Sequence, residues 1–174
     1  MAEAAPASAA AIVFEEAVFL DSIPRSLLRG MLYKWMNDME TESLNSLRKE
    51  AVCALQKQLE TNPSAEELCD TLWACIRLYQ NEPFVTSGRG KRPGVEFFYC
   101  LKRSKITGEE TGELLVNRKE RSKTLTKSSV SIGLSNALEV QREEGCVKGP
   151  KRLKVFGASY LYAIFLRFGI IRNC

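Results

Sequence analysis

Apolar residues recur at helical spacing between residues 27 and 79. Three stripes recur at intervals of three and four residues: Leu27, Leu28, Met31, Leu32, Trp35 and Met36, then Leu44, Leu47, Ala51, Val52, Leu55 and Leu59, then Leu68, Leu72, Cys75, Ile76 and Tyr79. This spacing places apolar side chains on one face of a helix. Ser64 and Glu67 also match a capping box, in which side-chain oxygens satisfy the first free N–H groups of a helix. These residues predict a bundle of three helices, over about 22–36, 41–60 and 65–80.

The rest of the chain is also predicted to be helical. We expect a helix over residues 95–105, although the run Phe97, Phe98, Tyr99 and Leu101 also suits a strand. Thr126 or Ser128 caps a helix that runs to about Glu144. A last helix over 158–168 is apolar on nearly every side, so other helices must bury it. The predicted fold is all-α, a compact bundle of about six helices with a Gly/Pro-rich basic loop at 87–94.

Charge divides the chain into two halves. Residues 1–80 carry 7 Lys and Arg against 12 Asp and Glu, whereas residues 81–174 carry 18 against 9. We therefore divide the chain into a largely disordered tail (1–20), an acidic three-helix part (21–80) and a basic helical part (81–174) that shares one core with it. A contact with a polyanion is expected in the basic part.

Several classes of function are excluded by composition. The chain has no histidine, which removes Ser-His-Asp and Cys-His catalytic sites and histidine-containing zinc sites. No pair of carboxylates lies in an apolar setting that would raise a pKa for acid-base catalysis. We therefore expect a protein that is not an enzyme and uses no cofactor or metal.

The cysteines and the first residues bear on the cellular compartment. None of the six cysteines forms a CxxC pair, and Cys53, Cys69, Cys75 and Cys100 lie among apolar neighbours, as buried free thiols do. Neither a secretory signal nor a mitochondrial presequence is expected from the alanine-rich, acidic start, and no apolar run is long enough to span a bilayer. These features predict a protein of the nucleus or cytoplasm with no membrane contact.

The loop at 87–94 is the first candidate binding site. Its cations Arg89, Lys91 and Arg92 can contact phosphates, and Gly88, Gly90 and Gly94 allow the backbone to approach a ligand closely. The glycine spacing matches neither a Walker A loop nor a dinucleotide-binding fingerprint. Phe84 is the best candidate among nearby aromatics for stacking on a base. A solvated loop between helices is the alternative.

Two further basic clusters follow in the sequence. Arg118, Lys119 and Arg121, with Lys123 and Lys127, form either an extension of the phosphate track, a localisation signal or ordinary surface. Lys151 and Arg152, with Lys148 and Lys154, precede the last helix and would add to the track if they lie near the loop in space.

Residues 44–105 resemble the RNA-binding domain of the phosphorylated adaptor for RNA export. The matching elements are Gln80-Asn81, Ser87-Gly88-Arg89, Lys91-Arg92-Pro93-Gly94 and the apolar run from Val95 to Lys102, in the same order. The second glycine of the family's Pro-Gly-Gly is missing here, and Gly90 interrupts the basic run. The resemblance implies a helical module that binds single-stranded RNA with little sequence preference.

The sequence thus favours binding of nucleic acid, with RNA ahead of DNA because of the resemblance. The alternative is a helical protein-protein interaction module that binds an acidic partner or a second copy of the chain. A helix-turn-helix DNA-binding protein using residues 126–140 is weaker, because that segment and the end of its helix offer only Lys127 and Arg142 as cations.

Overall fold

The computed structural model describes residues 25–88, 93–117 and 122–174, and it divides into two units, Met1–Asn45 and Ser46–Cys174. The first helix, α2, spans Arg25–Glu60. It is one continuous helix where the sequence predicts two, because no glycine or proline interrupts residues 31–60. Within the first unit, the described side chains from Asp38 to Asn45 are exposed apart from the half-buried Leu44.

Two helices of the second unit begin at the predicted caps. In α3 (Ala65–Leu78), the Glu67 N–H donates to Ser64 Oγ at 3.2 Å, and the Ser64 N–H donates to Glu67 Oε2 at 2.8 Å. In α4 (Lys127–Glu144), Thr126 rather than Ser128 is the cap, because its Oγ1 accepts from the Ser129 N–H at 3.1 Å. Gly145 ends α4 in the left-handed conformation. The capping box is therefore confirmed, and the open choice at α4 is settled.

The predicted all-α bundle is wrong, because the second unit contains a four-stranded antiparallel sheet and the fold is α+β. The strand order is β1 (Phe84–Val85), β2 (Glu96–Arg103), β3 (Glu110–Asn117) and β4 (Lys123–Thr126). β2 replaces the helix expected at 95–105. Its buried residues alternate at positions 97, 99 and 101, which is the period of a strand with one face covered. Apolar residues at positions 98 and 100 hid this alternation in the sequence.

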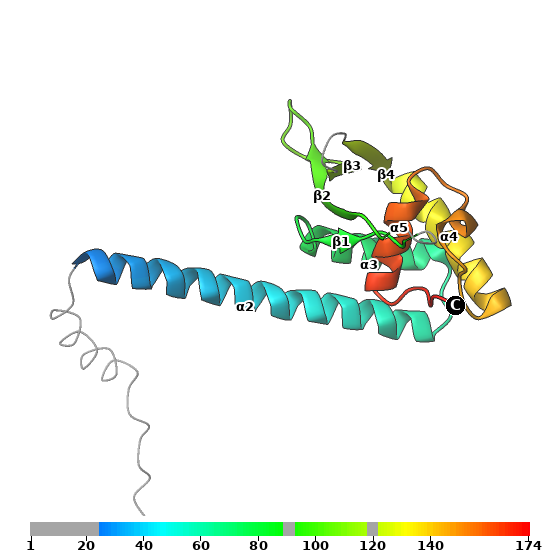
Figure 1. Cartoon of the computed structure of the whole chain (residues 1–174), viewed down its shortest axis with the longest axis horizontal. Coiled ribbons are helices and arrows are strands. Elements are labelled where there is room, and N and C mark those ends of the chain that lie inside the picture. The colour runs from blue at the N-terminus through cyan, green and yellow to red at the C-terminus, as the bar shows by residue number, and fades with distance from the viewer. Residues whose placement is uncertain (1–24, 89–92, 118–121) are drawn as a thin grey trace, which may run out of the picture. The chain divides into compact units, whose positions relative to one another are not determined.

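Helices cover one face of the sheet. In Figure 1, α3, α4 and α5 (Ala158–Arg167) lie on the same side of β2, β3 and β4. A short 3₁₀ helix, η1 (Pro150–Leu153), leads toward α5. The core joins Leu55 of α2, the inward side chains of all four strands and most of α5, whose residues 160–165 are buried as predicted. The core therefore includes residues from both sides of position 80. The Tyr99 hydroxyl donates to the Ile76 carbonyl at 3.0 Å inside it.

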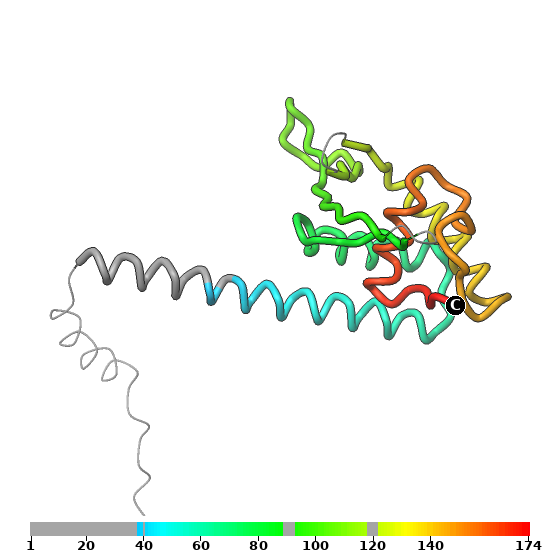
Figure 2. The backbone as a smooth tube through the Cα atoms, in the orientation of Figure 1, coloured from blue at the N-terminus to red at the C-terminus, as the bar shows by residue number. Residues whose placement is uncertain are grey.

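Two cysteines are paired. Cys146 and Cys174 form a disulfide with their Cα atoms 5.3 Å apart, so the red C-terminal segment in Figure 2 lies beside residues 146–147. Of the four cysteines expected to be buried thiols, Cys69 and Cys75 are buried, Cys100 is half-buried and Cys53 is exposed. Burial raises the pKa of the Cys75 thiol to about 11, which keeps it protonated and unreactive at neutral pH. None of the helices in the described ranges combines the length and hydrophobicity that a membrane crossing requires.

Candidate nucleic-acid interface

The residues that flank two of the predicted basic segments meet at one end of the sheet. Val85 pairs with Glu96, Phe98 pairs with Asn117, and Val116 pairs with Lys123. Strand β1 therefore ends, β2 begins, β3 ends and β4 begins at this end, which we call the loop end. The opposite end holds the β2–β3 turn, where Arg103 pairs with Glu110. The antiparallel order of the strands is what gathers segments that are thirty residues apart in the sequence.

Most of the predicted phosphate contacts lie outside the described residues. This applies to Arg89, Gly90, Lys91 and Arg92 in the first loop, and to Arg118, Lys119 and Arg121 in the second basic cluster. Their described neighbours Gly88 and Ser122 are exposed. The structure thus places the start and end of each segment, at the loop end of the sheet.

Gly94 has a structural role that explains why glycine occurs there. A Cβ atom at this position would lie 2.0 Å from the Thr86 carbonyl oxygen and 2.7 Å from Val85 Cγ1. The two chains approach closely because the Thr86 N–H donates to the Val95 carbonyl at 3.0 Å, and the Val95 N–H donates to Thr86 Oγ1 at 2.9 Å. Gly94 therefore allows the hairpin to close, and its presence needs no ligand.

The prediction that Phe84 stacks on a base is wrong. Its side chain is 2% exposed and lies in the core. The ring centroid is 5.7 Å from that of Phe97, 5.3 Å from that of Tyr99 and 6.3 Å from that of Phe168. Phe84 is buried because it lies on the inward face of β1, opposite Phe97. It anchors the start of the loop instead of contacting a ligand.

A pocket of about 440 Å³ opens at the loop end of the sheet. It is lined by Thr86 and Val95 at the base of the first loop, by Lys123 at the start of β4, and by residues 155–160. Phe156 is 65% exposed, and the Lys123 ammonium lies 5.6 Å from the centre of its ring. No side chain caps the first turn of α5, whose residues Ala158–Tyr160 belong to the lining. The Tyr160 N–H donates to the Gly157 carbonyl at 2.9 Å, so the turn is closed by its own backbone. An exposed aromatic ring and a cation thus share one pocket with the first turn of α5.

Sequence reasoning missed Phe156 as a site residue. In the sequence, Phe156 lies two residues after Lys154 and directly before Gly157. In the structure, Gly157 has a φ of 72°. A Cβ on Gly157 would lie 2.2 Å from Leu125 Cδ2, so this glycine packs directly on β4. The tight turn at Gly157 leaves the preceding Phe156 outside the core.

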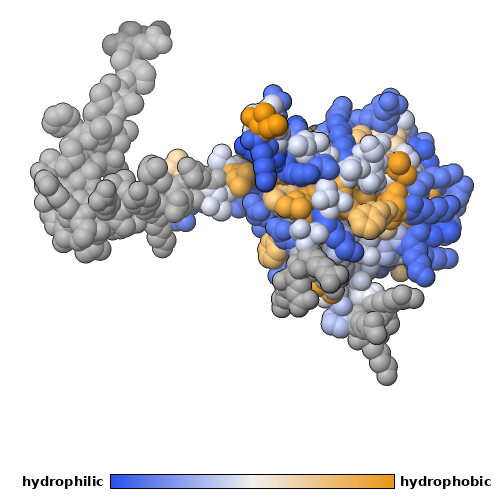
Figure 3. All heavy atoms as spheres, turned by 90° about the horizontal axis from the view of Figure 1, so that it is seen from above, coloured by the Kyte–Doolittle hydropathy of each residue, from blue (hydrophilic) through white to orange (hydrophobic). Residues whose placement is uncertain are grey.

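Phe98 is a second exposed aromatic ring near the loop end. It is 39% exposed on the uncovered face of β2. The other large exposed apolar side chains near this end are Val85 and Val95. Figure 3 shows the molecule from above, turned by 90° from the view of Figure 1. Hydrophobic residues interrupt a largely hydrophilic surface in this view.

The remaining predicted cations differ in their surroundings. Lys151 is exposed, whereas Arg152 forms an ion pair with Glu144 at the end of α4. Lys127 lies 2.9 Å from Asp70 Oδ1, and this contact lowers the pKa of the Asp70 carboxyl group. Arg152 and Lys127 are thus held by the chain's own acids. None of the cations in the third basic cluster, Lys148, Lys151, Arg152 and Lys154, lines the pocket. The residues that directly follow this cluster, 155–160, do line it.

No metal-binding cluster of Cys, Asp and Glu occurs among the described residues. Comparison of the chain with protein-family models, with curated proteins and with solved structures gave no match. The resemblance to the RNA-export adaptor domain therefore remains a prediction. The apolar helix that it implies is strand β2 in this structure.

Proposed function

We propose that this protein binds single-stranded nucleic acid at the loop end of its sheet, without catalysing a reaction. The observation that carries the proposal is the pocket in which Phe156 and Lys123 meet the base of the first loop. The preference for RNA over DNA rests on the resemblance alone.

Electrostatics and stacking supply the binding energy in this proposal. Residues 87–94 carry three cations and no acid, and residues 117–123 carry four cations and one acid. Each phosphate that such a cation neutralises releases counterions, so the affinity depends steeply on salt. Bases stack on exposed aromatic rings with about 1–3 kcal/mol each, with little dependence on base identity. Phe156 takes this role in place of Phe84, and Phe98 offers a second ring.

The test is a fluorescence anisotropy titration of labelled twelve-nucleotide RNA and DNA at two or more salt concentrations. Phe156→Ala should weaken binding by roughly 5- to 150-fold, which corresponds to the loss of one stacked base. Lys123→Ala should reduce the slope of log K against log salt by about 0.7, the value for one phosphate on a single strand.

Matched controls come from the opposite end of the sheet. Lys105 and Ile106 are exposed in the β2–β3 turn, and Ile106 is 96% exposed. Lys105→Ala and Ile106→Ala should leave affinity and salt slope unchanged. Equal losses at both ends would show nonspecific attraction to a cationic protein and would contradict the proposed interface, as would the absence of salt-dependent binding.

An acidic protein partner is the second candidate, because the exposed apolar residues Val85, Val95 and Phe98 beside cations also suit an amphipathic acidic peptide. Gel filtration with and without RNase separates nucleic-acid binding from protein-protein interaction. A mass that falls after RNase treatment supports nucleic acid, whereas an unchanged dimer supports a second copy of the chain as the partner. Tighter binding of polyglutamate than of RNA in the anisotropy assay would favour the acidic partner.

A further inference from the structure

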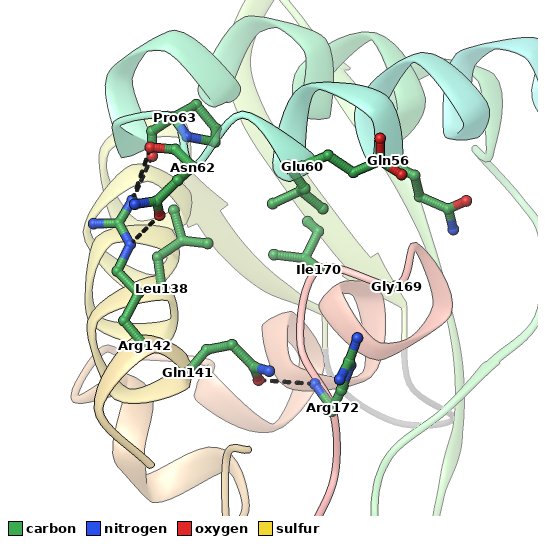
Figure 4. Close-up of a pocket in the computed structure, with 11 residues that line it drawn as sticks. Gln56, Glu60, Asn62, Pro63, Leu138, Gln141, Arg142, Gly169, Ile170 and Arg172 are labelled. Carbon is green, nitrogen blue, oxygen red and sulfur yellow. Dashed lines mark hydrogen bonds between the residues drawn. The ribbon is translucent and has the colours of Figure 1, made fainter. Parts of the chain in front are cut away.

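A second pocket lies away from the loop end and shares no lining residue with the first. It has a volume of about 320 Å³ and is formed by the end of α2, the C-terminal half of α4 and the segment after α5 (Figure 4). A volume in this range is typical of sites for small ligands. Apolar side chains of Leu59, Leu138 and Ile170 contribute to its lining, and Leu138 and Ile170 are 7% and 4% exposed.

Some polar residues of this pocket are occupied in building its walls. The Arg142 guanidinium donates to Asn62 Oδ1 at 2.7 Å and to the Pro63 carbonyl at 2.6 Å, and so ties α4 to the turn after α2. The Gln141 amide accepts from the Arg172 N–H at 3.0 Å and donates to the Gly145 carbonyl at 2.7 Å. These contacts hold the Arg142 and Gln141 side chains in place as parts of the pocket wall.

Two charged side chains of the lining are not occupied in this way. Within the described part of the chain, neither the Glu60 carboxylate nor the Arg172 guanidinium forms a hydrogen bond or an ion pair. Figure 4 shows Glu60 on α2 at one side of the pocket and Arg172 on the C-terminal segment at the other. The pocket thus presents one negative and one positive group, unpaired with each other, beside apolar side chains.

The backbone that carries Arg172 is fixed on both sides. The Val147 N–H donates to the Arg172 carbonyl at 2.8 Å, the Tyr162 hydroxyl contacts Asn173 Oδ1 at 2.8 Å, and Cys174 is bonded to Cys146. The segment therefore enters the pocket wall already ordered, which lowers the entropic cost of binding. Near Glu60, the C-terminal end of α2 adds partial negative charge, which favours a cationic group on the ligand.

We propose that this pocket binds a small zwitterion, an α-amino acid with an aliphatic side chain. Its carboxylate contacts the Arg172 guanidinium through charge-assisted hydrogen bonds. Its ammonium group contacts the Glu60 carboxylate. Its side chain lies against Leu59, Leu138 and Ile170. This site is independent of the nucleic-acid interface, so either proposal can fail without the other.

The experiment uses the full chain and three probes that share the leucine side chain. L-Leucine carries both charges, N-acetyl-L-leucine lacks the ammonium group, and L-leucinamide lacks the carboxylate. Binding is measured by calorimetry and by NMR shifts of the protein's methyl groups. L-Leucine should bind about tenfold or more tightly than either analogue, because each analogue loses one charge-assisted contact.

Two variants assign the contacts. Arg172→Gln should remove the discrimination between leucine and leucinamide, and Glu60→Gln should remove that between leucine and N-acetyl-leucine. Both side chains are exposed, so the variants should fold, which circular dichroism checks. Lys148→Gln changes an exposed charge that does not line the pocket and is the matched control. Equal binding of all three probes, no binding of leucine, or the same response in the control variant would overturn the proposal.

Discussion

The Lys123 ammonium lies 5.6 Å from the centre of the Phe156 ring, which joins the start of β4 to the turn before α5. A cation over an exposed aromatic face contributes about 0.5–1 kcal/mol at such a site. This energy is small enough for a ligand to replace. A base or a phosphate can therefore separate the two side chains at low cost, which suits a binding site better than a structural contact.

Removing the Thr126 hydroxyl should destabilise the protein, whereas removing the Ser128 hydroxyl should not. Thr126→Ala removes the oxygen that accepts from the Ser129 N–H, so we expect a loss of about 1 kcal/mol in the free energy of unfolding. Ser128→Ala is the control, with an expected change below about 0.5 kcal/mol. Urea denaturation measures both. A larger effect at Ser128 would mean that α4 begins two residues later.

Gly157→Ala should cost more than the strain of a left-handed residue alone. Gly108 has the same φ of 72°, but no atom lies within 4 Å of a Cβ placed there, whereas at Gly157 such a Cβ meets Leu125. We expect Gly108→Ala to lower the free energy of unfolding by about 1–2 kcal/mol, and Gly157→Ala to lower it by about 1–3 kcal/mol more because the core is overpacked. Thermal unfolding of both variants tests the difference. Equal losses would show that Leu125 on β4 moves aside without a cost in stability.

Alkaline pH should destabilise the protein through buried groups. Burial raises the pKa of the Tyr99 hydroxyl, as it does that of the Cys75 thiol. In the unfolded chain these groups lose their protons at their usual pKa values, near 10 and 9, while the folded protein keeps them. The unfolded state then binds fewer protons, so the free energy of unfolding falls as pH rises above about 9.

Tyr99→Phe should flatten this alkaline decline. At pH 7 the variant should be less stable by about 1–3 kcal/mol, because the buried Ile76 carbonyl loses its hydrogen bond with the hydroxyl. Urea denaturation at pH 7, 9, 10 and 11 measures both the loss of stability at pH 7 and the slope of the alkaline decline. Tyr79→Phe is the control, since the Tyr79 hydroxyl makes no hydrogen bond with the described residues. A decline with the same slope in Tyr99→Phe and wild type would exclude Tyr99 as its source.

Reduction of the disulfide should loosen the C-terminal segment. Cys146 and Cys174 are 28 residues apart, and closing a loop of that length stabilises a protein by about 2–4 kcal/mol. We expect Cys174→Ser to lose this amount under oxidising conditions and to be insensitive to reductant. Cys53→Ser, at an exposed free thiol, should behave as wild type. Unfolding with and without reductant measures the effect, and an identical midpoint for reduced and oxidised wild type would contradict it.

Hydrogen bonding within a few residues explains what could be predicted from the sequence. The capping box at Ser64 and Glu67 and the end of α4 at Gly145 depend on neighbours along the chain. The burial of α5 could be predicted for another reason, because its residues are apolar on nearly every side. Strand β2 could not be predicted in the same way. Apolar side chains at 97, 98, 99 and 101 allow either a helix or a strand, and only pairing with β3 selects the strand.

The candidate site, like the fold, could be predicted only in part from the sequence. The sequence by itself determined where the cations and glycines lie along the chain, and that histidine chemistry is absent. Only the tertiary structure decided that Phe84 is buried opposite Phe97, that Phe156 is exposed, and that Lys123 reaches it from a strand thirty-three residues earlier. Antiparallel pairing and helix packing bring these distant residues together, and such long-range contacts leave no periodic pattern in the sequence.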